Sequence, residues 1–248
     1  MNRTELHEAA LNGRLLQLRK LIDQTENVNL LDENNLTPLH EACINGKSAC
    51  VKLLLSAFAN PNVEDVCGRT PLYFACWRGC YKCCDLLLQK GATVNNEACI
   101  LAAIKCGSKP CIELLIKSGT KVTTSCLNAA CSTDVKILKM LLLASADSIE
   151  FVSSALQHAI HLKQPCHVRL LLKFGANPFI HLNEETAVDR HECNAILNAA
   201  KDHPCNLKDL CRIWLLYYFH LHNKDVDQMI NLPLPHAIKQ YVMFVVDV

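Results

Sequence analysis

Hydrophobic positions recur along this chain in a fixed pattern. An alanine, taken as an anchor, is followed twelve residues later by a leucine and then by a second aliphatic residue. The pattern occurs six times, with anchors at Ala9, Ala42, Ala75, Ala103, Ala129 and Ala159. The first three anchors are 33 residues apart. A period of that length indicates a stack of repeats, in which each unit buries its hydrophobic side against its neighbours.

Helix start and stop signals fall at fixed places around the anchors. A glycine four residues after the anchor, as at Gly13, Gly46 and Gly79, suits a left-handed helix stop. A short hydroxyl side chain, which can accept a hydrogen bond at a helix start, stands five residues before five of the anchors: Thr4, Thr37, Thr70, Thr124 and Ser154. Each unit is therefore predicted to be a capped helix, a glycine turn and a second helix that carries the leucine pair.

The second and third units resemble a known repeat. TPLHEAC followed by VKLLL, and GRTPLYFAC followed by LLLQKGATVN, are similar to the ankyrin repeat. The resemblance covers Thr4 to Asn177. It implies helix–turn–helix units, each followed by a hairpin-like finger, that stack into a curved solenoid. The expected fold class is all-α: about six ankyrin repeats, a capping half-repeat and a C-terminal helical segment.

The spacing of the anchors predicts where the repeats differ. It runs 33, 33, 28, 26 and 30 residues, whereas the distance from the anchor to the end of the second helix stays at 16 in Ala75–Gly91, Ala103–Gly119 and Ala159–Gly175. The shortening therefore falls on the surface fingers and not on the helices, which form the core. We expect fingers that are truncated after the third repeat.

Composition and charge argue against a nucleic-acid-binding, membrane or secreted protein. Half of the residues are hydrophobic and the net charge is +1, so an unselective surface for nucleic acid or membranes is not expected. The first residues, MNRTELHEAALNG, contain no apolar signal region, and no apolar run reaches the length of a membrane span. We expect a cytoplasmic protein that could also enter the nucleus.

The 16 cysteines follow the repeat. Cys43 and Cys76 share one repeat position, and Cys50, Cys83 and Cys111 share another, as expected for small buried hydrophobic residues.

The alternative is a zinc site formed by Cys76, Cys80, Cys83 and Cys84. A structural zinc site needs two separated ligand pairs, and there is no second CxxC motif. We therefore predict core packing, with no metal and no cofactor. A thiol enzyme would need a cysteine beside a positioned histidine, and no pair in the sequence indicates one, so the protein is not expected to be an enzyme.

The positions two and three residues after each anchor are the most irregular in the chain. By resemblance to ankyrin proteins, these positions and the finger tips contact protein partners. The residues expected to bind a target are Ile44, Asn45, Arg69, Trp77, Arg78 and Lys105. For Trp77, two interpretations stay open. Beside Arg78 it has the composition of an interface hot spot, but it could instead fold down on Pro71 or on the neighbouring repeat.

The array is predicted to end before His203-Pro204, where proline disfavours helix in the residue preceding it. A half-repeat begins at Thr186, with His191 in the anchor position. We expect an ankyrin-repeat domain over residues 1–202 and a separate segment over 203–248. That segment places Leu207, Leu210, Cys211 and Leu215 on one helical face. Its other faces are also apolar, so a helix there must be buried on several sides.

The tail resembles a SOCS box, because LKDLCRIWL is followed about twenty residues later by LPLPHAIKQY. In that family the first helix binds the elongin B–elongin C pair, and the LPLP element selects the scaffold cullin five. The resemblance assigns elongin binding to Leu207, Leu210, Cys211 and Leu215. It assigns cullin binding to Leu232, Pro233, Leu234 and Pro235. Asn206 stands where the family has serine or threonine, but asparagine caps a helix equally well.

Together the two resemblances point to the ankyrin-repeat and SOCS-box family. They imply a substrate-recognition subunit of an elongin–cullin–RING E3 ubiquitin ligase, which holds a target protein for ubiquitination and proteasomal degradation. The alternative is a non-catalytic ankyrin scaffold or inhibitor that binds a partner without recruiting a ligase.

Overall fold

The computed structural model describes residues 3–94, 97–144, 149–177 and 191–202. Every regular element in these ranges is an α-helix. The chain divides into two compact units, Met1–Lys121 and Val122–Val248, and each is described by itself. The predicted boundary at residue 203, and the tail beyond it, lie outside the described residues.

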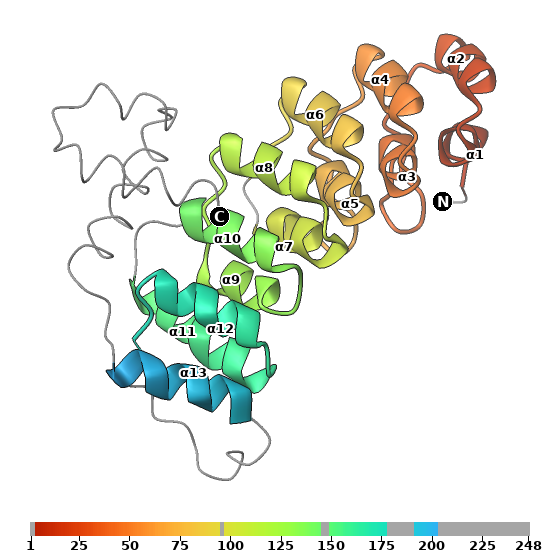
Figure 1. Cartoon of the computed structure of the whole chain (residues 1–248). Helices are drawn as coiled ribbons and strands as arrows, with labels where there is room; N and C mark the ends of the chain where they lie inside the picture. The colour runs from red at the N-terminus through yellow and green to blue at the C-terminus, as the bar shows by residue number, and fades with distance from the viewer. Residues whose placement is uncertain (1–2, 95–96, 145–148, 178–190, 203–248) are drawn as a thin grey trace, which may run out of the picture. The chain divides into compact units, whose positions relative to one another are not determined.

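The N-terminal unit is two rows of helices. The inner helices α1, α3, α5 and α7 pack against one another in sequence, and the outer helices α2, α4, α6 and α8 form the second row (Figure 1). The helices, in chain order, are α1 (Glu5–Asn12), α2 (Leu15–Gln24), α3 (Pro38–Ile44), α4 (Ser48–Ser56), α5 (Pro71–Arg78), α6 (Tyr81–Gln89), α7 (Glu97–Cys106) and α8 (Lys109–Lys117).

The second unit continues the same alternation. Helix α9 packs on α11 and α10 on α12, and α13 packs on α12. The helices are α9 (Thr124–Ala130), α10 (Val135–Ala144), α11 (Ile149–His161), α12 (Pro165–Lys173) and α13 (His191–Asp202). Helix α13 therefore covers the last complete pair, as a terminal half-repeat should. Thr186, its predicted start signal, lies outside the described residues.

The repeated apolar positions form the core. Five anchors, Ala9, Ala42, Ala75, Ala103 and Ala159, are at most 1% exposed. The leucines twelve residues later are fully buried in the same way, at Leu54, Leu87, Leu115, Leu141 and Leu171. In the first repeat Leu21 is only half-buried, because α2 has a neighbouring repeat on one side only.

Two of the predicted helix starts are wrong. Helix α11 begins at Ile149, so Ser154 lies inside it and does not cap it. In helix α9 the N-cap position is held by Thr123, one residue before the predicted Thr124, and its side chain makes no capping hydrogen bond. Its register shifts with it, since Ala130 is fully buried while the expected anchor Ala129 is partly exposed. Both helices follow a short connection and begin at or before the hydroxyl residue that was predicted to cap them.

The truncation of the fingers is confirmed. Residues 25–37 and 57–70 join the first three helix pairs, whereas 90–96, 118–123 and 145–148 join the third, fourth, fifth and sixth pairs in turn. The connection to α13 lies mostly outside the described residues. The two long fingers are linked, because the Val66 amide donates to the Asn34 carbonyl at 3.1 Å. Within the first of them the Asp32 carboxylate accepts from the Asn34 and Leu36 amides, each at 2.8 Å.

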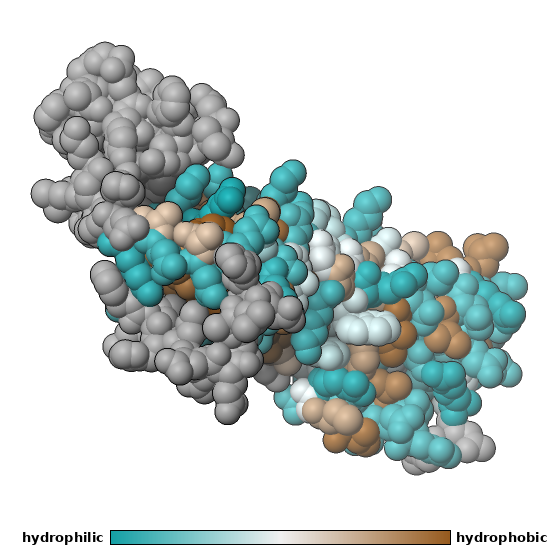
Figure 2. All heavy atoms as spheres, turned by 60° about the horizontal axis from the view of Figure 1, so that its bottom comes forward, coloured by the Kyte–Doolittle hydropathy of each residue, from teal (hydrophilic) through white to brown (hydrophobic). Residues whose placement is uncertain are grey.

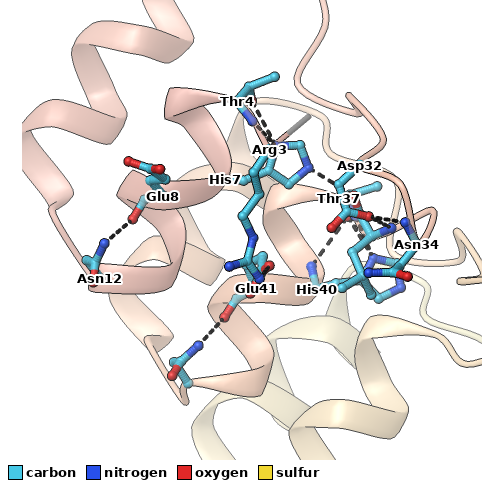
Figure 3. Close-up of polar contacts among 12 residues, drawn as sticks. Arg3, Thr4, His7, Glu8, Asn12, Asp32, Asn34, Thr37, His40 and Glu41 are labelled. Atoms are coloured by element: carbon cyan, nitrogen blue, oxygen red, sulfur yellow. Dashed lines mark hydrogen bonds and ion pairs between the residues drawn. The ribbon is translucent and has the colours of Figure 1, made fainter. Parts of the chain in front are cut away.

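A buried histidine of one repeat binds the finger that leads to the next repeat; Figure 3 labels the two histidines, His7 and His40. In α3 the Thr37 amide donates to His40 Nδ1 at 3.0 Å. Because a carbonyl can only accept, His40 Nε2 carries the proton and donates to the Arg69 carbonyl at 3.2 Å. His7 repeats the arrangement with Leu36, at 2.9 Å. In the third repeat Tyr73 stands at this position, and there the following connection is short.

No helix among the described residues is long and apolar enough to cross a membrane.

Phe58 occupies a backbone conformation that favours glycine. Its φ is 62° and its side chain is 91% exposed. At the corresponding turns the chain has Gly91, Gly119 and Gly175, with φ of 82°, 85° and 87°. A left-handed conformation strains the backbone of a residue that carries a Cβ. Because the Phe58 ring is exposed, it gains no hydrophobic burial that could offset this strain.

Replacing Phe58 with glycine should therefore stabilise the protein by about 0.5–1 kcal/mol, the relief of strain less the added entropy of the unfolded chain. Chemical denaturation of the wild type and Phe58→Gly measures this difference. Phe58→Ala is the control, because it removes the ring but keeps the strain. Equal stabilisation by both substitutions would contradict the explanation.

His40 should make stability depend on pH. Burial lowers its pKa from 6.5 to about 4, although the bond to the Arg69 carbonyl opposes the shift. As pH falls from 6.5 towards 4, the unfolded chain binds a proton that the folded protein does not. The free energy of unfolding should therefore fall across this window, by up to about 3 kcal/mol from His40.

The matched control is His40→Gln, whose amide keeps a donor and an acceptor but does not titrate. Denaturation curves at several pH values should give a shallower slope for this variant between pH 6.5 and 4. Equal slopes for wild type and variant would show that His40 does not carry the effect.

Candidate partner-binding surface

The turns that join inner to outer helices lie along one side of the N-terminal unit. We call this side the turn edge and define it as residues 11–16, 44–49, 77–82 and 105–110. Neighbouring turns are in contact. A Cβ built on Gly13 would lie 2.9 Å from Lys47 Cδ, one on Gly46 would lie 3.5 Å from Arg78 Cγ, and one on Gly79 would lie 2.8 Å from Cys106 Sγ. The four turns therefore form one continuous surface.

Five of the six predicted target-binding residues lie on the turn edge. Trp77, Arg78 and Lys105 are exposed, and Ile44 and Asn45 are half-buried. Trp77 is 54% exposed, so its indole is available on the surface and not folded into the core. The Asn45 side chain donates to the Glu41 carbonyl at 3.1 Å, which leaves its carbonyl oxygen for a partner.

Arg69 lies apart from this group, just before the first residue of α5, whereas Trp77 and Arg78 lie at the end of that helix. Its guanidinium is already engaged. Nε donates to the Asp65 carboxylate at 2.8 Å, and the charged group lies 4.9 Å from the centre of the Phe74 ring. The structure thus gives Arg69 a role in holding the finger, and its predicted role in target binding stays a prediction.

The ion pair of Arg69 with Asp65 also affects the pKa of the Asp65 carboxyl. Burial by itself would raise the pKa of this carboxyl, but hydrogen bonds from the Arg69 side chain and from the Arg69 and Cys67 amides outweigh it and lower the pKa. Asp65 therefore stays ionised at neutral pH and accepts the hydrogen bonds from the Cys67 and Arg69 amides within its finger.

Further exposed apolar residues, which were not predicted from the sequence, lie on the same surface. Tyr81 is 45% exposed, and Leu15 and Leu16 are 42% and 81% exposed. In Figure 2 hydrophobic groups reach the surface in small clusters among hydrophilic ones, as at many protein-binding surfaces. Their exposure could have been predicted from their positions in the sequence. Tyr81 follows Trp77 by four residues across the glycine turn, and Leu16 precedes the first buried leucine of α2 by two.

Most of the described cysteines pack in the core as predicted, whereas Cys67, Cys106 and Cys166 are exposed and Cys80 is half-buried. Three buried cysteines of the third and fourth repeats lie near one another. Cys84 Sγ is 3.7 Å from Cys76 Sγ and 3.8 Å from Cys111 Sγ, and all three side chains are fully buried. Burial raises the pKa of Cys43, and that of Cys131 to about 12, so these two thiols are protonated and poorly nucleophilic at neutral pH. Within the described ranges, no three His, Cys, Asp or Glu side chains are arranged to hold a metal ion.

Because Trp77 is exposed, its removal should leave the fold almost unchanged. We expect Trp77→Ala to alter the free energy of unfolding by less than about 1 kcal/mol. Leu72→Ala on the same helix is the control; Leu72 is fully buried, and its truncation should cost about 2–5 kcal/mol. A loss for Trp77→Ala as large as that of the control would place the indole in the core.

Comparison with known proteins supports the repeat architecture. A family model described as ankyrin repeats, in three copies, matches residues 6–98. No curated protein matches the sequence. Among solved structures, the human ASB11 ankyrin repeat domain is 32% identical, with a TM-score of 0.69, covering 78% of this chain and 98% of that one.

The ankyrin repeat domain of Bcl-3, described as a unique member of the IkappaB protein family, is 24% identical, with a TM-score of 0.62, covering 71% of this chain and 88% of that one. At this identity the similarity concerns the fold alone. The repeat pattern, the stacked helix pairs and the likeness to the ASB11 domain agree on a protein-interaction fold of a kind that is typically non-catalytic. The chain belongs to the ankyrin-repeat family.

Proposed function

We propose that this protein is the substrate-recognition subunit of an elongin–cullin–RING E3 ubiquitin ligase in the cytoplasm. The ankyrin repeats hold a target protein, and the tail recruits the ligase. The proposal gives each part of the chain one task, and neither task needs a catalytic residue or a cofactor.

The observation that carries the proposal is the pattern of the tail sequence. Leu207, Leu210, Cys211 and Leu215 fall at offsets 0, 3, 4 and 8, which is one face of a helix. The intervening residues include Ile213, Trp214 and Tyr217, so the other faces are apolar as well. A segment of this composition requires burial on several sides. The elongin B–elongin C pair, which binds the corresponding helix in SOCS-box proteins, supplies such a surface.

The second tail motif supports the choice of cullin. The prolines of LPLP, at Pro233 and Pro235, fix φ and so present Leu232 and Leu234 with little loss of entropy on binding. In the SOCS-box family this element selects cullin five, which brings a RING subunit and the charged ubiquitin carrier. The chemistry then depends on proximity, because target lysines are held at high effective concentration near the ubiquitin thioester.

The ankyrin half of the proposal draws on the described structure. The turn edge offers the exposed Trp77 and Arg78 and the half-buried Ile44. An aromatic residue beside an arginine is the usual composition of an interface hot spot. The likeness to the human ASB11 ankyrin repeat domain extends over the repeats, while the tail contributes the argument from sequence.

Co-expression with elongin B and elongin C, followed by size-exclusion chromatography, tests the proposal. The wild-type chain should elute as a complex with both elongins in equal amounts. The double variant Leu207→Asp, Cys211→Asp should lose this complex, because each carboxylate would have to be buried without a partner. The control is Lys208→Ala, Asp209→Ala, which changes the neighbouring positions but keeps the apolar face.

Circular dichroism of each variant checks that the ankyrin repeats remain folded. If the wild type elutes as a folded monomer that ignores the elongins, the ligase proposal is wrong. The protein would then be an ankyrin scaffold or inhibitor that acts through its repeats alone.

A further inference from the structure

The turn edge carries one sign of charge. Arginine or lysine is present in every one of its four segments, and none contains aspartate or glutamate. The cations are Arg14, Lys47, Arg78, Lys82, Lys105 and Lys109. The chain as a whole has a net charge of only +1, so this row is a local concentration of positive charge and not a property of the whole surface.

Most of these cations are available to a partner. Arg14, Lys47, Arg78, Lys82 and Lys105 are exposed. Among the described residues, none of these five cations forms an ion pair with a carboxylate, in contrast to Arg3 with Glu41 and Arg69 with Asp65. The stems of Lys47 and Arg78 lie against the glycine turns before them, so their charged groups are partly ordered before any partner binds.

Apolar side chains are interleaved with the cations. Trp77 immediately precedes Arg78, and Tyr81 immediately precedes Lys82. Leu15 and Leu16 follow Arg14, and Leu16 is 81% exposed. A surface of this kind suits a ligand that alternates negative and apolar groups, because a purely ionic ligand would leave the aromatic and leucine side chains in water.

We propose that the turn edge binds an extended acidic segment of a partner protein, one in which carboxylates alternate with apolar side chains. Resting on the proposed function, this inference names the chemical class of the target: a protein that presents such a segment to the ankyrin repeats.

The geometry of the stack sets the spacing of the acidic residues. Packed helices lie about 8–10 Å apart, so successive turns place their cations at about that interval. An extended chain advances about 3.3–3.6 Å per residue, and about three residues therefore span one repeat. The partner segment should carry Asp or Glu at roughly every third position, with apolar residues between them.

A protein segment fits better than a nucleic acid because the basic row is narrow. Glu8, Asp85 and Glu113 lie one helical turn beyond the turn edge, on α1, α6 and α8. Their carboxylates would repel the closely spaced phosphates of a nucleic acid. A single extended peptide can follow the row without meeting them.

The test is a binding measurement on the full chain with a defined probe. The probe is a fluorescein-labelled peptide of four Glu-Leu-Phe repeats, and the same peptide with glutamine in place of glutamate is the neutral comparison. Fluorescence anisotropy should show binding of the acidic peptide that weakens as salt is raised. The glutamine peptide should bind at least about tenfold more weakly.

Matched charge reversals locate the site. Lys47→Glu, Arg78→Glu should weaken binding of the acidic peptide by at least about tenfold. The control, Lys52→Glu, Lys90→Glu, makes the same change in net charge at two exposed lysines outside the turn edge, and should change the affinity by less than about twofold.

Three results would overturn the inference. One is an equal effect of the two double variants, and another is no binding of the acidic peptide up to about 1 mM. The third is tighter binding of a single-stranded oligonucleotide than of the peptide, with the same dependence on Lys47 and Arg78, which would make the turn edge a nucleic-acid site.

The elongin assay is run on the same variants. Lys47→Glu, Arg78→Glu should still form the complex with elongins B and C, because both changes lie outside the tail. For the wild-type chain, failure to bind the peptide while the elongin complex forms would overturn the turn-edge inference alone. Peptide binding by the wild-type chain without an elongin complex would overturn the ligase proposal alone.

Discussion

Each repeat leaves one hydrophobic side uncovered until the next repeat is stacked upon it. The inner helices pack closely through small residues. Ala42 in α3 and Ala75 in α5 are fully buried, and α3 packs on α5 and α5 on α7. In α2, which has a neighbouring repeat on one side only, Leu21 remains half-buried. Every other feature of the fold depends on this stacking, because no single helix pair can bury its own leucines.

Stacking also organises the surface. Once the inner helices are in register, the turns that follow them are placed side by side, and the contacts of Lys47 with Gly13 and of Arg78 with Gly46 show how closely. Residues that are 33 positions apart in sequence thereby become neighbours. A row of cations on four separate turns, each unremarkable in its own repeat, becomes one binding surface only in the folded protein.

The two long fingers of the N-terminal unit are each held by a buried histidine. His7 and His40 donate to the carbonyls of Leu36 and Arg69 in the two long fingers. Tyr73 stands at the same position before the first short connection. His40 must stay neutral to accept from the Thr37 amide, and burial lowers its pKa to about 4, which links the second long finger to pH.

The core was readable from sequence because it repeats. The anchor alanine is buried in five of six repeats, and so is the leucine twelve residues later; the spacing predicted the short fingers. Leu21 is half-buried in the first repeat. The other exceptions follow short connections, where Ser154 falls inside α11 and the register at Ala129 shifts. Surface residues were harder to predict, because exposure is decided by neighbours from other repeats. Trp77 could not be assigned to surface or core, and the engagement of Arg69 by Asp65 was not foreseen.

The account divides the chain into repeats that hold a target and a tail that recruits a ligase. Hydrogen–deuterium exchange of the full chain, with and without the elongin B–elongin C pair, tests this division most directly. The account predicts strong protection from exchange within residues 207–219 when the elongins are present, and unchanged exchange in α1 to α8. Protection of the turn edge by the elongins, or no protection of the tail, would contradict it.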